Sequence, residues 1–369
     1  MAEDQLQKRV QRFILDARAA RSSNSVGGHA IGTGIGAVRR ENQDRALIVQ
    51  AVYQGMPERN FTMGVVCDGI GGMSHGEDAA VTAISVFVSR VLRSPGLGPE
   101  SRLFHAVEAA NDAVFSQLRG RGGSTIAAAF FDDNGRITTV NVGDSRVYAL
   151  MQTGALQRLT RDDTLAEFLR NSGKEAGHHA NSLVQFVGMG EGIEPHVRSL
   201  YDIGVFQRLL VSSDGIHSAP EEVFGSVLRS AETSSEVIRR LLLLSEIMGG
   251  RDNASAVVFD VPAKPNRYEA QQGLNVTLVS SFSQLEVWIP ILAEGQSRNE
   301  RLTASLTEAA TPDQRPGKAA QEGRSTPGRP RSNKRRRPAA NVAEQESELP
   351  LDDQTQPELN VEFPNKQEE

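Results

Sequence analysis

The sequence predicts an α+β protein in which strands come in runs and helices come in pairs. Apolar, β-branched segments at residues 46–52 and 63–68 are typical of strands, and four more such segments lie between residues 125 and 213. Two long stretches with one apolar face, residues 79–92 and 102–118, predict a helix pair. This grouping favours separate layers of strands and helices over alternating βαβ units.

Shorter elements complete the prediction. Helices are expected at residues 220–228 and 232–247, and a closing strand at residues 254–261. Residues 4–20 have apolar positions at helical spacing and predict an amphipathic helix, followed by RSSNSVGG, which we interpret as a linker. Between residues 273 and 293, LNVTLVSS and LEVWIPIL predict two strands that either extend a sheet edge or form a small cap.

These elements divide the chain into four parts. We expect an N-terminal helix and linker at 1–27, a main domain at 28–262, extra strands or a cap at 263–296, and a disordered tail at 297–369. The tail is rich in Pro, Gln, Glu, Arg and Ser, and it has too little apolar area to offset the entropy of ordering. A basic core is followed by an acidic end, so the tail is either a solvated polyampholyte or a docking segment for a partner.

Composition narrows the class of protein. The formal net charge of −6 gives the domain no tendency to bind nucleic acid, and the single cysteine, Cys67, excludes a disulfide framework. No apolar run is long enough to cross a bilayer, and the charged N-terminus lacks the apolar core of a signal peptide. We therefore expect a cytoplasmic protein, and we expect it to be a monomer.

Five short acidic motifs carry the chemistry. Each places an aspartate next to an apolar, strand-like run, in most cases beside a glycine. The motifs are ENQD with Asp44, VVCDGIGG with Asp68, VNVGDSR with Asp144, VSSDGI with Asp214 and GRDN with Asp252. Carboxylates raised to strand ends are hard oxygen ligands of the kind that Mg²⁺ and Mn²⁺ prefer. The pattern predicts a metal site and therefore metal-assisted hydrolysis.

In order and wording these motifs resemble the bacterial form of the type 2C, metal-dependent (PPM) protein serine/threonine phosphatases. The resemblance covers roughly residues 28 to 262 and also includes VRRENQD, GGST and LLVSSDG. It implies a four-layer αββα sandwich, with two antiparallel sheets flanked by helix pairs and a metal cleft at one edge. It also implies hydrolysis of phosphoserine and phosphothreonine in proteins, the targets of a cognate kinase, by a water that bridges two tightly bound Mn²⁺ or Mg²⁺ ions.

The resemblance assigns roles to individual residues. Asp68 would bridge the two metals, and the backbone carbonyl of Gly69 would reach the second one. Asp214 and Asp252 would complete the shell of the first metal, while Asp44 would act mainly through metal-bound waters. The following glycines, Gly71 and Gly72, would let the chain turn without steric cost.

Some other positions match the family pattern, and others differ from it. Arg39, five residues before Asp44, would grip the substrate phosphate with its guanidinium fork; a plain surface charge is the alternative. Gln43 replaces a glutamate common in the family, which weakens any direct ligation there. Ile70 stands where many eukaryotic members carry a histidine, and His75 is expected to cap or pack, so the general acid stays unidentified.

A third, weaker metal ion is implied at Asp144. In bacterial relatives the matching aspartate, with the one matching Asp214, can hold such an ion beside a variable flap, here residues 160–190. Glycines 173, 177 and 188 would let the flap move. Alternatively, Asp144 could simply pair with Arg146.

Two other functions compete with this interpretation. The same fold could bind a phosphoprotein while hydrolysing it weakly or not at all, although no core metal aspartate is missing. A small-molecule phosphomonoesterase is disfavoured because a cleft with few aromatic residues offers little to enclose a metabolite.

Overall fold

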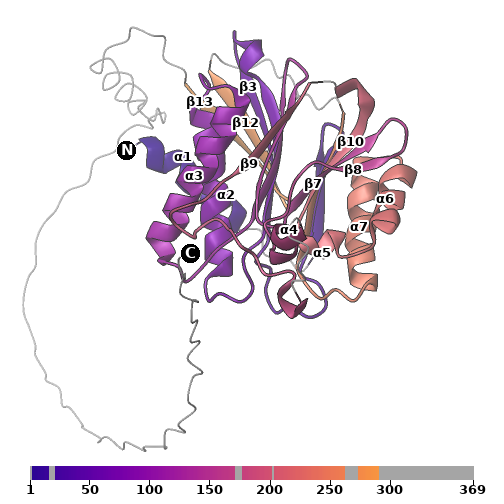
Figure 1. Ribbon diagram of the computed structural model, residues 1–369. Coiled ribbons are helices and arrows are strands. Elements are labelled where there is room, and N and C mark those ends of the chain that lie inside the picture. Colours follow the sequence, from indigo (N-terminus) through magenta and orange to yellow (C-terminus); the bar gives the residue numbers. More distant parts are fainter. Residues whose placement is uncertain (1, 16–20, 171–176, 202, 262–272, 291–369) are drawn as a thin grey trace, which may run out of the picture. The chain divides into compact units, whose positions relative to one another are not determined.

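The computed structural model describes residues 2–15, 21–170, 177–201, 203–261 and 273–290. Within the unit formed by residues 1–298, the described residues form the predicted four-layer sandwich, with two sheets face to face and helices on both outer faces (Figure 1). The predicted fold class is therefore confirmed.

The first sheet has seven strands in the order β13-β12-β3-β4-β5-β6-β9, and neighbouring strands are antiparallel. They are β3 (Arg45–Tyr53), β4 (Phe61–Cys67), β5 (Ile126–Asp132), β6 (Ile137–Val142), β9 (His196–Leu200), β12 (Leu274–Val279) and β13 (Gln284–Ile289). The hairpin β12–β13 pairs with β3, so LNVTLVSS and LEVWIPIL extend a sheet and do not form a cap.

The second sheet has six strands in the order β1-β2-β11-β10-β7-β8, again antiparallel. They are β1 (Arg21–Val26), β2 (His29–Gly34), β7 (Arg146–Met151), β8 (Leu156–Arg158), β10 (Phe206–Ser212) and β11 (Ala254–Asp260). The linker interpretation of RSSNSVGG is wrong, because Arg21–Val26 pairs with β2 as the edge strand β1. Hydrogen bonding to a neighbour, not apolar burial, makes this polar segment a strand.

Helices cover the two outer faces, with α1, α2 and α3 on one side and α6 and α7 on the other (Figure 1). The helices are α1 (Ala2–Leu15), α2 (Gly76–Arg93), α3 (Pro99–Leu118), α4 (Leu165–Arg170), α5 (Asp214–His217), α6 (Glu221–Ser230) and α7 (Ser234–Ile247). Helix α2 contacts β3 and β4, and α7 contacts β2 and β11. The predicted helices at residues 79–92, 102–118, 220–228 and 232–247 correspond to α2, α3, α6 and α7.

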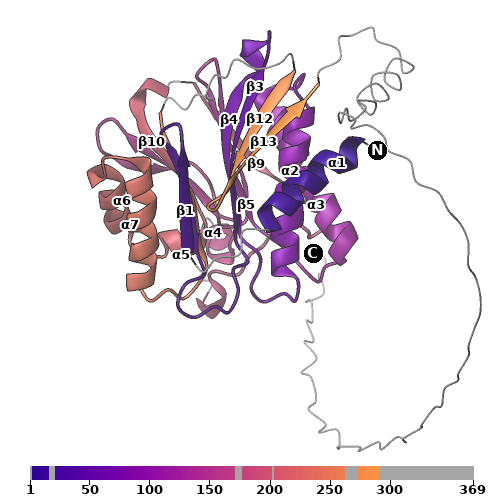
Figure 2. The ribbon, with the colours of Figure 1, turned by 180° about the vertical axis from the view of Figure 1, so that it is seen from behind.

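Helix α1 is part of the domain core. Leu6, Val10 and Ile14 are buried in the same apolar cluster as the inner faces of α2 and α3, and α1 lies against α2 (Figure 2). The amphipathic pattern is thus confirmed over residues 2–15, whereas residues 16–20 lie outside the described part. Together with β1, this packing means that a domain boundary at residue 27 would cut through packed elements.

The two sheets meet in a separate apolar layer. They pack closely at Gly64 of β4, where a Cβ atom would lie 2.4 Å from the ring of Phe259 on β11. Glycine is required at this position because a side chain would occupy the space of that ring. A third cluster joins the six-stranded sheet to α6 and α7.

The predicted disordered tail at 297–369 lies outside the described residues, and so do residues 263–272 and 291–296 of the segment predicted to hold extra strands or a cap at 263–296. Among the described helices, none has both the length and the apolar character that crossing a membrane requires.

Candidate metal centre

The five motif aspartates come from both sheets. Asp44 directly precedes β3 and Asp68 directly follows β4, and because Arg45 pairs with Cys67 the two aspartates lie at the same end of the seven-stranded sheet. Asp214 follows β10, whose last residue pairs with Arg146 at the start of β7, just after Asp144. Antiparallel pairing therefore places the start of one strand beside the end of its neighbour, and the loops there collect carboxylates.

Four of the aspartates line one cavity of about 390 Å³. Its charged lining residues are Arg39, Asp68, Asp144, Asp214 and Asp252. The remaining wall includes Ile70, Thr125 and the flap residues Asn181, Ser182, Leu183 and Phe186. Residues that are up to 213 positions apart in the sequence thus meet at one edge of the sandwich.

Asp44 lies behind the cavity and not in its wall. Its side chain is buried, and one carboxylate oxygen, Oδ2, accepts a hydrogen bond from Ser213 Oγ at 2.7 Å. The other oxygen, Oδ1, is buried without a hydrogen-bond partner. This position agrees with the expectation of an indirect role and does not by itself test it.

Burial and mutual repulsion raise the pKa of these carboxyls. Loss of hydration is the largest cause in each case: it raises the pKa of Asp44 and of Asp214 to about 7, and that of Asp144 to about 6. Asp68 has a pKa well above its ordinary value, from burial first and then from the charges of Asp44 and of the three other aspartates that line the cavity. The ionised form of these carboxylates is therefore unfavourable in the folded chain, and a bound cation would stabilise it.

The donor set fits a hard divalent cation. Oδ1 of Asp214, like Oδ1 of Asp44, is buried without a hydrogen-bond partner, and carboxylate oxygens are the ligands that Mg²⁺ and Mn²⁺ prefer. Among the described residues, no three Asp, Glu, His or Cys side chains converge on one point as they stand.

Arg39 holds Asp252. Its guanidinium Nη2 donates to Asp252 Oδ2 at 2.5 Å, and this bond is the main cause that raises the pKa of Arg39. A Cβ atom on Gly71 would lie 2.6 Å from Arg39 Nη1, so the glycine makes room for the guanidinium. Gly71 and Gly72 are the central residues of a turn in which the N–H of Met73 donates to the carbonyl of Ile70 at 3.0 Å, as the sequence predicts, although neither has a positive φ.

Gly69 is constrained by packing. A Cβ atom there would lie 2.3 Å from the backbone oxygen of Gly76 at the start of α2. Asp68, the preceding residue, is held at the backbone: its N–H donates to Thr125 Oγ1 at 3.0 Å, and its carbonyl accepts from Thr125 N at 2.8 Å. The GGST motif thus positions the strand end that carries Asp68.

Asn253 positions the ENQD loop, a role that the sequence analysis missed. Its Nδ2 donates to the carbonyls of Ile35 and Glu41, and its Oδ1 accepts from the N–H of Gln43 at 2.8 Å. The residue stands beside Asp252 in GRDN, so its motif position was the available signal. Gln43 itself turns its side chain to Glu41 at 3.1 Å and does not line the cavity.

Asp144 does not pair with Arg146. The guanidinium of Arg146 instead donates to Asp162 at distances of 2.6 to 3.1 Å and to Tyr148 Oη. The loop that carries Asp144 is held by Asp163, whose Oδ2 accepts from the N–H of Gly143 at 2.8 Å. Asp163 also contacts His196 at 2.7 Å, and no sequence signal links two residues this far apart.

The flap borders the cavity and is partly fixed. Backbone bridges join Ser124 to Val187 and Thr164 to Leu183. Gly188, expected to allow movement, has a φ of 104° and donates its N–H to Asn111 Oδ1 at 2.9 Å, and a Cβ there would meet Val114. The positive φ and the close packing explain why glycine occupies position 188. Position 173 lies outside the described residues.

His75 lies at the start of helix α2 and not in the metal cavity. It occupies the residue before α2, and its ring nitrogen lies 3.0 Å from Asp78 Oδ2 in the first turn. It does not line the cavity, whereas Ile70 does. No histidine lines the cavity within the described part of the chain.

Known proteins with similar sequences carry one activity in their names. Over 238 residues the chain is 32% identical to the serine/threonine protein phosphatase PstP of Mycobacterium tuberculosis, covering 61% of this chain and 43% of that protein. It therefore spans less than half the length of that relative. Over 242 residues it is 26% identical to the serine/threonine phosphatase stp of Listeria monocytogenes, covering 61% of this chain and 92% of the relative. No protein-family model matches the chain.

Solved structures give the same picture. The crystal structure of the M. tuberculosis serine/threonine phosphatase PstP/Ppp superposes with a TM-score of 0.54 and 27% identity, covering 66% of this chain and all of the other. The catalytic domain of PstP in complex with two manganese ions superposes with a TM-score of 0.52 and 27% identity, over 65% of this chain and 98% of the other.

Proposed function

Because the chain belongs, by sequence and by fold, to the bacterial PPM-type phosphatases, we propose that it hydrolyses phosphoserine and phosphothreonine in proteins with divalent metal ions. The observation that carries this proposal is the cavity itself, where four aspartates from both sheets and one arginine meet. The four carboxylates carry enough negative charge to bind two divalent cations, and the arginine can bind one phosphate.

Each residue has a distinct task in this proposal. Asp68, Asp214 and Asp252 would hold the ions with the carbonyl of Gly69, and Asp44 would support them from behind. When bound, two divalent ions supply an activated water and offset the charge of the phosphoryl group. Arg39 would orient the phosphate once its guanidinium leaves Asp252, so Asp252 and the substrate compete for the same fork.

The proposal is tested by manganese-dependent release of phosphate from a phosphothreonine peptide, with a chelator as control. We expect Asp68→Asn to abolish nearly all turnover while the far-UV circular dichroism stays that of the parent. The proposal is falsified if chelated protein hydrolyses the peptide at the original rate. If the peptide binds in the presence of Mn²⁺ but is not hydrolysed, the chain is instead a phosphoprotein-binding module.

We further propose a third, weaker ion at Asp144, beside the flap. Asp144 lines the metal cavity, and burial first, then the charge of Asp162, raise its pKa to about 6, so a bound cation would favour its ionised form. Asp144→Ala should lower phosphopeptide turnover while direct metal counting still finds two ions. A variant whose activity equals the parent's at every Mn²⁺ concentration would remove Asp144 from this role.

The biological setting is part of the proposal. Substrates would be targets of a serine/threonine kinase, and because that kinase draws on ATP inside the cell we place the enzyme in the cytoplasm, in signalling. We propose that residues 28–262 supply the metal site and that the tail at 297–369 docks a protein partner. We propose a monomer, since the metal site draws on residues of one chain.

A further inference from the structure

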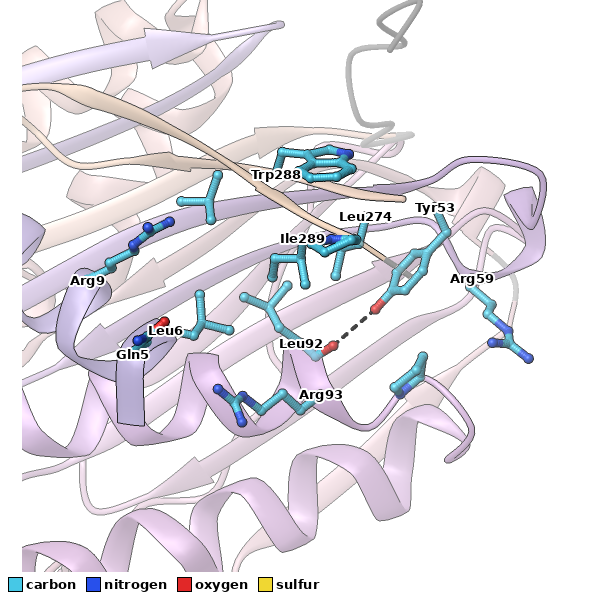
Figure 3. Close-up of a pocket in the computed structure, with 13 residues that line it drawn as sticks. Gln5, Leu6, Arg9, Tyr53, Arg59, Leu92, Arg93, Leu274, Trp288 and Ile289 are labelled. Atoms are coloured by element: carbon cyan, nitrogen blue, oxygen red, sulfur yellow. Dashed lines mark hydrogen bonds between the residues drawn. The ribbon is translucent and has the colours of Figure 1, made fainter. Parts of the chain in front are cut away.

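A second cavity, of about 620 Å³, lies between α1 and the β12–β13 hairpin (Figure 3). Its lining residues are Gln5, Leu6, Arg9, Tyr53, Arg59, Leu92, Arg93, Pro95, Leu274, Val287, Trp288, Ile289 and Pro290. None of these residues lines the metal cavity. Helix α1 and the hairpin both lie outside residues 28–262, the part that resembles the phosphatase family.

The inside of this cavity is apolar. Leu6, Leu274 and Val287 have almost no exposed surface, while Trp288 is 44% exposed. The one hydroxyl in the lining, Tyr53 Oη, is already bonded: it donates to the carbonyl of Leu92 at 3.2 Å and accepts from the buried Arg102. The cavity therefore offers contact to an apolar group.

Arginines surround this apolar interior. Figure 3 shows Arg9 and Arg59 on opposite sides, with Leu6, Leu92 and Ile289 between them. Arg93 lines the cavity near the end of α2. The described lining includes neither Asp nor Glu, and the acidic neighbour of Arg59, Glu58, lies at 4.0 Å. The wall thus combines apolar contact with separated positive charges.

We propose that this cavity is a docking site for an acidic segment of a partner protein, in which a pair of apolar side chains is flanked by carboxylates. Its volume is in the range of binding pockets, and arginine and tryptophan are the residue types that contribute most at protein interfaces. Because Arg9 and Arg59 are on opposite sides, one carboxylate head cannot reach both, whereas a peptide with carboxylates on each side of its anchor can. A peptide therefore fits the wall better than a simple amphiphile.

The test is fluorescence anisotropy of a labelled peptide with a central Leu-Phe pair flanked by glutamates, titrated with the full chain. We expect Arg9→Glu and Arg59→Glu each to weaken binding about tenfold or more, equivalent to ~1.4 kcal/mol. Arg239→Glu, on the exposed face of α7, is the matched control and should bind like the parent. Added salt should weaken binding of the parent, since the contacts are charged and near the surface.

The peptide provides a control that does not depend on the folding of variants. Replacing its glutamates with lysines, or its Leu-Phe pair with alanines, should abolish binding to the parent. The proposal is wrong if the lysine peptide binds as tightly, or if both arginine variants bind like the parent. It is also wrong if decanoate binds the cavity while the peptide does not, or if sedimentation shows a dimer that Trp288→Ala dissociates.

Discussion

Arg39 makes one contact in the described structure and would make another during the proposed reaction. It donates to Asp252 at 2.5 Å, and a substrate phosphate would compete with this carboxylate for the same guanidinium. Since bonds to charged groups contribute about 1.5–3 kcal/mol, Arg39→Ala should lower kcat/KM for a phosphopeptide roughly 10- to 150-fold. Arg40→Ala, at the neighbouring exposed position outside the cavity, should stay near the parent value.

Arg39→Lys separates charge from geometry. A lysine keeps the positive charge but cannot bond in two parallel contacts, so we expect kcat/KM between the values of the parent and the alanine variant. An unchanged kcat/KM for Arg39→Ala would show that Arg39 serves only to neutralise Asp252.

At this scale the sequence predicted the charged residues better than their supports. The residues that line the cavity as predicted are Asp68, Asp144, Asp214, Asp252 and Arg39. The prediction was possible because their motifs stand next to apolar, strand-like runs in the sequence. The roles of Asn253 and Asp163 were missed, because each depends on a hydrogen bond to a backbone group in another loop. Such partners are set by tertiary packing, which a single motif does not encode.

Among the elements, α1 is the predicted helix, and the structure adds that it packs into the domain core. Ile14 is 1% exposed and packs in the cluster that α2 and α3 share. Ile14→Ala should therefore lower the free energy of unfolding by about 2–5 kcal/mol, measured by urea denaturation. The control is Arg12→Ala, at an exposed position of the same helix, which should lie within about 0.5 kcal/mol of the parent. Equal stability of parent and Ile14→Ala would show that α1 is dispensable to the domain.

Patterns with strong periodicity were predicted correctly, and weak ones were not. The strands β3 to β7 were visible as largely apolar runs because they are buried on both faces, and the paired helices were visible because burial of one face imposes a period on the sequence. Strand β1 is mostly polar, with one buried residue at its end, and β9 is only partly buried. Edge strands like these are defined by pairing with a neighbour, so their sequences carry little signal.

For the whole molecule, the raised pKa values predict how stability depends on pH. In the unfolded chain an aspartate has a pKa of about 3.9, whereas Asp44 and Asp214 reach about 7 in the folded chain. Between these values the folded protein binds more protons, so its stability should fall as pH rises from about 4 to about 7. In a chelator, the melting temperature should be higher at pH 5.5 than at pH 8.

Manganese should reverse this trend, because it binds the ionised carboxylates and only the folded chain presents them together. At pH 8 we expect Mn²⁺ to raise the melting temperature. Asp214→Asn in chelator should melt above the parent at pH 8 and depend less on pH, since one buried charge is gone. A parent that melts equally at both pH values in chelator, or a variant no more stable than the parent, would contradict this explanation.

The close packing of Gly64 against Phe259 has a consequence for the aspartates of the metal site. The ring of Phe259 fills the space beside Gly64, and Asp68 stands four residues beyond Gly64 at the end of β4, while Asp214 and Asp252 lie beside strands β10 and β11 of the other sheet. We therefore expect the packing at Gly64 to contribute to the distance between the carboxylates of the two sheets, because a side chain there would displace Phe259 or push the sheets apart. A bulkier residue at position 64 should move the aspartates of the two sheets apart. The cavity would then prefer a larger cation or bind two small cations more weakly.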